Sequence, residues 1–215
     1  IMDCRSENNF YSDPKYFPIF TLNIFVLMFC TLLASGPLFV AAIDWRHFFH
    51  QIGISPELAA TFPIWFDLNT AYLPNALPMG FSWSPYIAQN ITWAIILLGQ
   101  DGALSPYFDL KDVGKWTTTP AWLALYAVRE KGDKSPRRMV GAVFVLLDNV
   151  FIMGCCNITV QGCLDNIRRN CAEFQVWEKR NNKGELPGVI TIADSRNGNN
   201  DTAKVGPMAD SFGIE

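Results

Sequence analysis

The chain has 215 residues and a formal net charge of −3, with 17 lysines and arginines against 20 aspartates and glutamates. Hydrophobic residues make up 50% of it, which is ample for the core of one large domain. The acidic balance excludes a surface that is basic overall, so charge by itself does not indicate nucleic-acid binding.

The cysteines bear on the cellular compartment. Six occur without any CxxC spacing, which argues against a zinc site or a disulfide framework. Free and mostly buried thiols are typical of a reducing compartment, so we expect an intracellular protein, cytoplasmic or nuclear. The chain opens with Ile1 and Met2, which suggests a piece of a longer protein or an imperfect gene model.

Residues 17–43 contain no charged residue, and about 20 apolar residues are enough to cross a bilayer. The Ser-Gly-Pro sequence at 35–37 interrupts this run and leaves 21–34 as a helix of the length common in soluble proteins. The following LFVAAID predicts a short buried strand that ends at Asp44. We therefore expect no membrane partner, and an anchor through 17–43 is the alternative.

The central part of the chain predicts strands and loops over 62–76, then a loop with Pro and Gly, then a helix. The helix is expected in YIAQNITWAIILLG (86–99), where apolar residues recur at helical spacing. Residues 100–138 are mixed and more polar. After Gln161 another helix is expected, followed by a last strand in PGVITIADS (187–195) and a polar tail.

The segment VFVLLDNVFIMG (143–154) predicts a β-hairpin, because apolar, β-branched and aromatic residues flank Asp148 and Asn149. We expect these two residues to form the turn, since turns with positive φ favour Asn, Asp and Gly. Two interpretations remain open. The pair only reverses the chain, or it holds a carboxylate at the tip of a sheet where a metal ion could bind.

Three motifs in chain order resemble the palm of a reverse transcriptase from a retroelement. AIDWRHFFHQI has the first motif's aspartate, an aromatic residue after four positions, and His-Gln-Ile. LPMGFSWSPYIAQ has the Leu-Pro-x-Gly, Pro and Gln spacing of the second motif, and the Asp148 hairpin matches the third. Together they cover about 38–154, and they look closest to retroelements of the LTR-like, tyrosine-recombinase or trypanosomatid type.

The resemblance implies an α+β fold, the right-hand polymerase palm, in which an antiparallel sheet packs on helices, with partial fingers. It assigns 1–37 to partial fingers and a lead-in helix, 38–160 to the palm, and 161–215 to a C-terminal palm helix and flexible tail. An insertion near 100–138 is implied as well, because the stretch between Pro85 and Asp148 is longer than in compact retroviral-type enzymes.

The implied reaction is template-directed addition of deoxynucleotides with two Mg²⁺ ions, or Mn²⁺ in their place. Such ions lie roughly 3.5–4 Å apart, activate the attacking 3′ oxygen and stabilise the leaving pyrophosphate. The implied partners are an RNA or DNA template with its primer and deoxynucleoside triphosphates. Lys179 or Lys183 lies where the family places a lysine that protonates pyrophosphate, although both could be exposed lysines of a turn.

Asp44 and Asp148 are the expected metal ligands, because each ends an apolar strand and Mg²⁺ needs only a few carboxylates beside water and phosphate. Asn149 completes the expected catalytic set. It replaces the family's second aspartate, and Leu146 replaces an aromatic residue. Asparagine offers a carbonyl oxygen but no negative charge, so an active polymerase and a decayed copy that keeps only the fold both remain open.

The nucleotide-binding residues that the resemblance implies are Phe49, Met79, Gly80 and Gln89. Phe49 falls at the aromatic steric gate, where a ring would collide with a ribose 2′-hydroxyl. Met79 and Gly80 fall in the loop beside the nucleotide and template base, where glycine allows close backbone approach. The alternatives are a core position for the phenylalanine, an ordinary turn for the loop, and a capping or packing role for Gln89.

Overall fold

The computed structural model describes residues 4–97, 121–127 and 138–192. Most of the expected insertion near 100–138 and the whole expected tail after 192 lie outside these residues. The elements are α1 (Arg5–Asn8), α2 (Leu22–Leu33), β1 (Leu38–Asp44), α3 (Phe48–Gln51), α4 (Pro56–Ala59), β2 (Ile64–Trp65), β3 (Ala71–Tyr72), α5 (Ser84–Leu97), β4 (Trp122–Tyr126), β5 (Met139–Leu146), β6 (Asn149–Gly154), α6 (Asn157–Glu173) and β7 (Ile190–Ile192).

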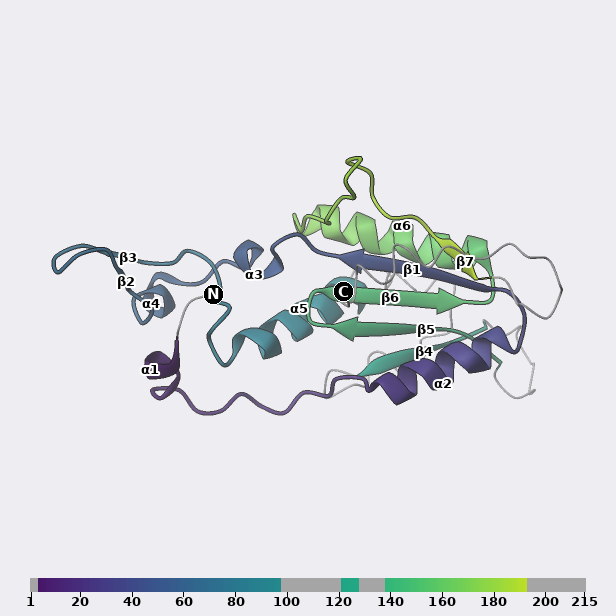
Figure 1. The fold of residues 1–215 in the computed structure, drawn as a ribbon, viewed down its shortest axis with the longest axis horizontal. Helices are drawn as coiled ribbons and strands as arrows, with labels where there is room; N and C mark the ends of the chain where they lie inside the picture. The colour runs from purple at the N-terminus through teal and green to yellow at the C-terminus, as the bar shows by residue number, and fades with distance from the viewer. Residues whose placement is uncertain (1–3, 98–120, 128–137, 193–215) are drawn as a thin grey trace.

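A five-stranded sheet with the order β4-β5-β6-β1-β7 forms the centre of the protein (Figure 1). Every neighbouring pair in it is antiparallel. The expected α+β class, an antiparallel sheet packed on helices, is therefore confirmed. Strand β1 pairs with β6 from Phe39 to Asp44, and the register places Asp44 opposite Asn149.

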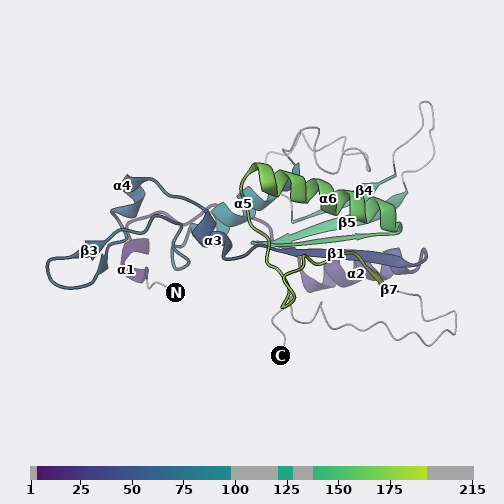
Figure 2. The ribbon, with the colours of Figure 1, turned by 90° about the horizontal axis from the view of Figure 1, so that it is seen from above.

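Helices cover both faces of the sheet because side chains alternate along each strand. Strand β1 sends Ala41 and Ile43 into the cluster that contains residues of α5 and α6. It sends Leu38 and Val40 to the other face, where they pack with Phe25 and Leu32 of α2. Figure 2 shows α6 and α2 on opposite sides of the sheet. Burial on both faces explains why β1 and β6 read as continuous apolar runs.

The predicted early helix and strand are confirmed. The Thr21 hydroxyl caps α2 by accepting a hydrogen bond from the backbone N–H of Ile24. The helix has 12 residues and is followed by Gly36 at a φ of 143°, which only glycine adopts without strain. Across the described residues, no helix combines the length and the apolar character that crossing a membrane requires.

The predicted hairpin is confirmed, but its predicted turn residues are wrong by one position. Leu146 pairs with Asn149, so the two turn residues are Leu147 and Asp148. Leu147 adopts a φ of 56°, in the left-handed region that a branched side chain rarely occupies. Asn149 belongs to the first position of β6 because it pairs with β5 on one side and with Asp44 on the other.

Two further segments differ from the sequence-based expectation. Helix α6 begins at Asn157, before the predicted start, and ends at Glu173, so residues 177–180 follow it as extended chain. Strand β4 (Trp122–Tyr126) lies inside the polar region where no strand was predicted. Its Leu123 and Leu125 alternate with more exposed residues, which is the pattern of an edge strand.

A small extension lies beyond the end of the sheet where β1 stops (Figures 1 and 2). It contains α1, α4 and the β2–β3 hairpin, and its own core is formed by Cys4, Phe62, Leu77 and Phe81. The Asn8 side chain fixes the loop after β3 by donating to the Gly80 carbonyl at 3.1 Å and accepting from the Ser82 N–H at 2.9 Å.

Candidate functional site

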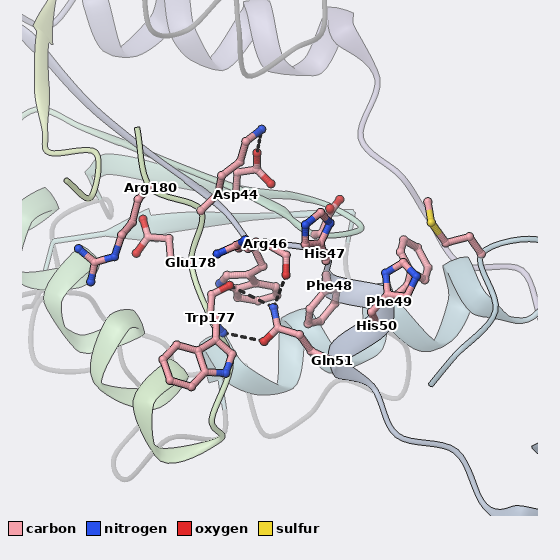
Figure 3. Close-up of a pocket in the computed structure, with 14 residues that line it drawn as sticks. Asp44, Arg46, His47, Phe48, Phe49, His50, Gln51, Trp177, Glu178 and Arg180 are labelled. Atoms are coloured by element: carbon pink, nitrogen blue, oxygen red, sulfur yellow. Dashed lines mark hydrogen bonds and ion pairs between the residues drawn. The ribbon is translucent and has the colours of Figure 1, made fainter. Parts of the chain in front are cut away.

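An open cavity of about 800 Å³ lies where the end of β1 meets the β5–β6 turn (Figure 3). Its lining comes from separate parts of the chain: the sheet end, α3, the loop after β3, and the segment after α6. The lining residues are Asp44, Trp45, Arg46, His47, Phe48, Phe49, His50, Gln51, Met79, Asp148, Trp177, Glu178, Lys179 and Arg180.

The structure brings the two predicted metal ligands together at this rim. Asp44 ends β1 opposite Asn149, and the backbone N–H of Trp45 donates to the Asp148 carbonyl at 3.3 Å. Burial raises the pKa of the Asp148 carboxyl above its usual 3.8, and the negative charge of Asp44 adds to this rise. A partly buried carboxyl beside a second carboxylate forms a site that favours a cation.

Asn149 contacts the same carboxylate. Its side-chain Nδ2 donates to Asp148 Oδ1 at 3.1 Å, which leaves its carbonyl oxygen unused in this bond. Within residues 4–97, 121–127 and 138–192, no three His, Cys, Asp or Glu side chains form a group that could hold a metal. Two carboxylates with an amide oxygen nevertheless fit Mg²⁺, which completes its shell with water and substrate phosphates.

Only one of the two predicted lysines reaches the carboxylates. Lys179 Nζ lies 3.0 Å from Asp44 Oδ2, and its backbone N–H donates to the Asp44 carbonyl at 2.7 Å. Lys183 is exposed in a turn, where its N–H donates to Asn181 Oδ1, and it does not line the cavity. The structure therefore places Lys179, and not Lys183, beside the two acids.

Of the four predicted nucleotide-binding residues, the structure places two at the cavity and two outside its lining. Phe49 and Met79 line the cavity, and Met79 is 47% exposed. The neighbouring Phe48 also borders the cavity, but it is buried and contacts the Trp45 ring, so it belongs to the core. Phe49 is partly buried and packs against the same core. Gly80, the residue after Met79, does not line the cavity. Its carbonyl accepts a hydrogen bond from the Asn8 side chain.

Gln89 has no exposed surface and does not line the cavity. Its Nε2 donates to the Val145 carbonyl at 3.1 Å, and its Oε1 accepts from the Leu147 N–H at 2.7 Å. The Thr92 hydroxyl, one helical turn further along α5, donates to the Leu147 carbonyl. Helix α5 therefore holds the turn that carries Asp148, including its left-handed residue.

A second set of contacts fixes the segment that carries Lys179 (Figure 3). The Gln51 amide accepts from the Trp177 N–H at 2.7 Å and donates to the carbonyls of Trp177 and Arg46. Glu178, which is 6% exposed, receives two hydrogen bonds of 2.8 Å from Arg168 of α6. These contacts tie residues 177–179 to β1, α3 and α6 at once.

Three residues at the cavity have no predicted role: Arg46, Gln51 and Trp177. Gln51 stands in the His-Gln-Ile motif that carries the resemblance. No pattern in the sequence shows which groups its side chain would bond. Arg46 lies two residues after Asp44 and is exposed at the cavity. Trp177 follows a helix without any local pattern. Long-range contacts bring it to the site: the antiparallel bridge between Trp45 and Glu178, and its backbone bonds to Arg46 and Gln51.

Comparison with known family models and curated proteins finds no match to this chain. The function of the chain is therefore inferred from the residues and the arrangement described above.

Proposed function

We propose that this chain is the palm, with partial fingers, of a retroelement reverse transcriptase that adds deoxynucleotides to a primer on an RNA or DNA template. The observation that carries the proposal is the meeting of Asp44 and Asp148. They come from motifs about a hundred residues apart and lie side by side at one end of an antiparallel sheet.

The surrounding residues support the same reaction. Asp44 and Asp148 would hold two Mg²⁺ or Mn²⁺ ions, which when bound activate the primer 3′ oxygen and stabilise the leaving pyrophosphate. Phe49 borders the cavity from α3, where its ring can exclude a 2′-hydroxyl by steric contact. Met79 borders it from the loop after β3, which the resemblance places beside the nucleotide and the template base.

The charges at the cavity suit a triphosphate as well as metal. Arg46, Lys179 and Arg180 line it together with Asp44, Asp148 and Glu178, and Glu178 is paired with Arg168 of α6. Cations beside a nucleotide site neutralise the phosphates and stabilise charge that develops during transfer. Because the chain as a whole is acidic, this local group of cations is the feature that would attract the substrate.

Primer extension on RNA and DNA templates, with Mg²⁺ and separately with Mn²⁺, tests the proposal. The wild-type protein is expected to extend the primer, and Asp148→Ala and Asp44→Ala are expected to lower the rate at least about a hundredfold, the loss typical when a charge-stabilising group is removed. Asp165→Ala is the matched control, because Asp165 is an exposed carboxylate of α6 outside the cavity.

Equal extension by wild type and Asp148→Ala would show that any polymerase signal comes from a contaminant. In that case the chain would be a copy that retains the fold without the activity, and the replacement of the second aspartate by Asn149 would be its cause.

A further inference from the structure

Lys179 contacts a carboxylate that the proposed reaction requires for metal. Its ammonium lies 3.0 Å from Asp44 Oδ2. An ammonium at this distance satisfies the oxygen with one positive charge, as a bound cation would. Lys179 and a divalent ion therefore compete for one ligand.

The backbone of Lys179 is fixed while its side chain is not. Its N–H is bonded to the Asp44 carbonyl, and the preceding Glu178 is held by Arg168. The Lys179 side chain is 64% exposed, whereas the Asp44 side chain is 29% exposed. The four-carbon side chain can thus leave the carboxylate by rotation about its own bonds, with no change in the main chain.

We propose that Lys179 acts as an internal counter-ion, which occupies Asp44 when no divalent ion is bound and withdraws from it when one binds. The inference rests on the proposed function, since it takes Asp44 as a metal ligand. Its consequence is that the site alone has a weaker affinity for divalent ions than two carboxylates would otherwise have. Lys179 also offsets part of the repulsion between the two carboxylates at the sheet end.

Binding of Mn²⁺ alone, without nucleotide or primer, measures this competition. The free-ion electron paramagnetic resonance signal reports how much Mn²⁺ remains in solution at each protein concentration. Lys179→Met keeps the aliphatic stem and removes the charge. We expect this variant to bind Mn²⁺ about 1.4-fold to fivefold more tightly than wild type, the range that follows from the strength of an exposed ion pair.

Lys15→Met is the matched control, because it removes the same charge from an exposed lysine outside the cavity. Its Mn²⁺ affinity is expected to equal that of wild type. In the Asp44→Ala background, Lys179→Met is expected to give no gain, since the shared ligand is gone. Lys179→Gln serves as a second neutral variant if Lys179→Met folds poorly by circular dichroism.

The results separate this inference from the proposed function. If Asp44→Ala weakens Mn²⁺ binding and neither Lys179→Met nor Lys179→Gln strengthens it, the counter-ion role is wrong and the metal site stands. If Asp44→Ala and Asp148→Ala both bind Mn²⁺ as wild type does, the metal site itself is wrong, and the counter-ion role is overturned with it.

Discussion

The buried Gln89 side chain accepts a 2.7 Å hydrogen bond from the backbone N–H of Leu147, the residue directly before Asp148. Its Nε2 donates to the Val145 carbonyl, so one amide is bonded both to the end of β5 and to the first residue of the turn. Leu147 has a positive φ although it is not a glycine. This turn therefore needs support from outside its own strands. Gln89 links the second sequence motif to the third.

Gln89→Leu is expected to lower the free energy of unfolding by about 1–3 kcal/mol, because it leaves a buried N–H and a buried carbonyl without partners. Urea denaturation measures this loss. Primer extension should fall as well, because Asp148 loses its fixed position. Gln161→Leu on α6 is the control, and its effect should stay within about 0.5 kcal/mol. A Gln89→Leu protein of wild-type stability would contradict the supporting role.

Asp148→Asn is expected to stabilise the protein at neutral pH while it removes activity. Burial and the charge of Asp44 raise the pKa of Asp148 in the folded state, so the folded protein holds the proton more tightly than the unfolded chain. Stability from this group is present below the ordinary pKa of 3.8 and is lost as pH rises through the higher folded value.

The stability gain of Asp148→Asn at pH 7 should be about 0.5–2 kcal/mol, as is typical when a strained active-site group is removed. The gain should shrink as pH falls toward and below the ordinary pKa of the carboxyl. Thermal denaturation across this pH range measures it. A variant that is less stable than wild type at pH 7 would show that the carboxylate is well compensated in the metal-free protein.

Phe49→Val is expected to increase incorporation of ribonucleotides relative to deoxynucleotides by about tenfold or more, because a smaller side chain removes the steric contact with the 2′-hydroxyl. Single-nucleotide primer extension with each substrate gives the ratio. Phe48→Val is the comparison, since Phe48 is buried against Trp45. Phe48→Val should lower stability without changing the ratio of ribonucleotide to deoxynucleotide incorporation. An unchanged ratio for Phe49→Val would show that Phe49 is not the steric gate.

Glu178→Ala is expected to lower the free energy of unfolding by about 3–5 kcal/mol, because it leaves the Arg168 guanidinium partly buried without its carboxylate. The loosened segment should also release Lys179 from Asp44. Chemical denaturation measures the first effect. Glu185→Ala, in the exposed turn nearby, is the control. The double variant with Arg168→Ala should recover part of the loss, and no recovery would mean that the two residues act separately.

Several elements could be predicted from the sequence because their causes are local. The charge-free run with its Thr cap and Gly stop predicts α2, and the short apolar run ending in an acid predicts β1. The hairpin was also predictable, since apolar runs flank a polar pair. Strand β4 was missed because its five residues stand in a polar region, and its pairing with β5, the next strand along the chain, has no signal in the local pattern.

The sequence by itself determined the α+β class, the apolar strands that end in Asp44 and near Asp148, and the motif order from which a nucleotidyl-transfer site is proposed. Only the tertiary structure shows that Leu147 and Asp148 form the hairpin turn and that Gln89 is bonded to it. It also shows that Lys179, and not Lys183, contacts Asp44. Periodicity and capping act over one or two helical turns. Register and side-chain contacts join residues that lie tens to more than a hundred positions apart, and no local pattern encodes them.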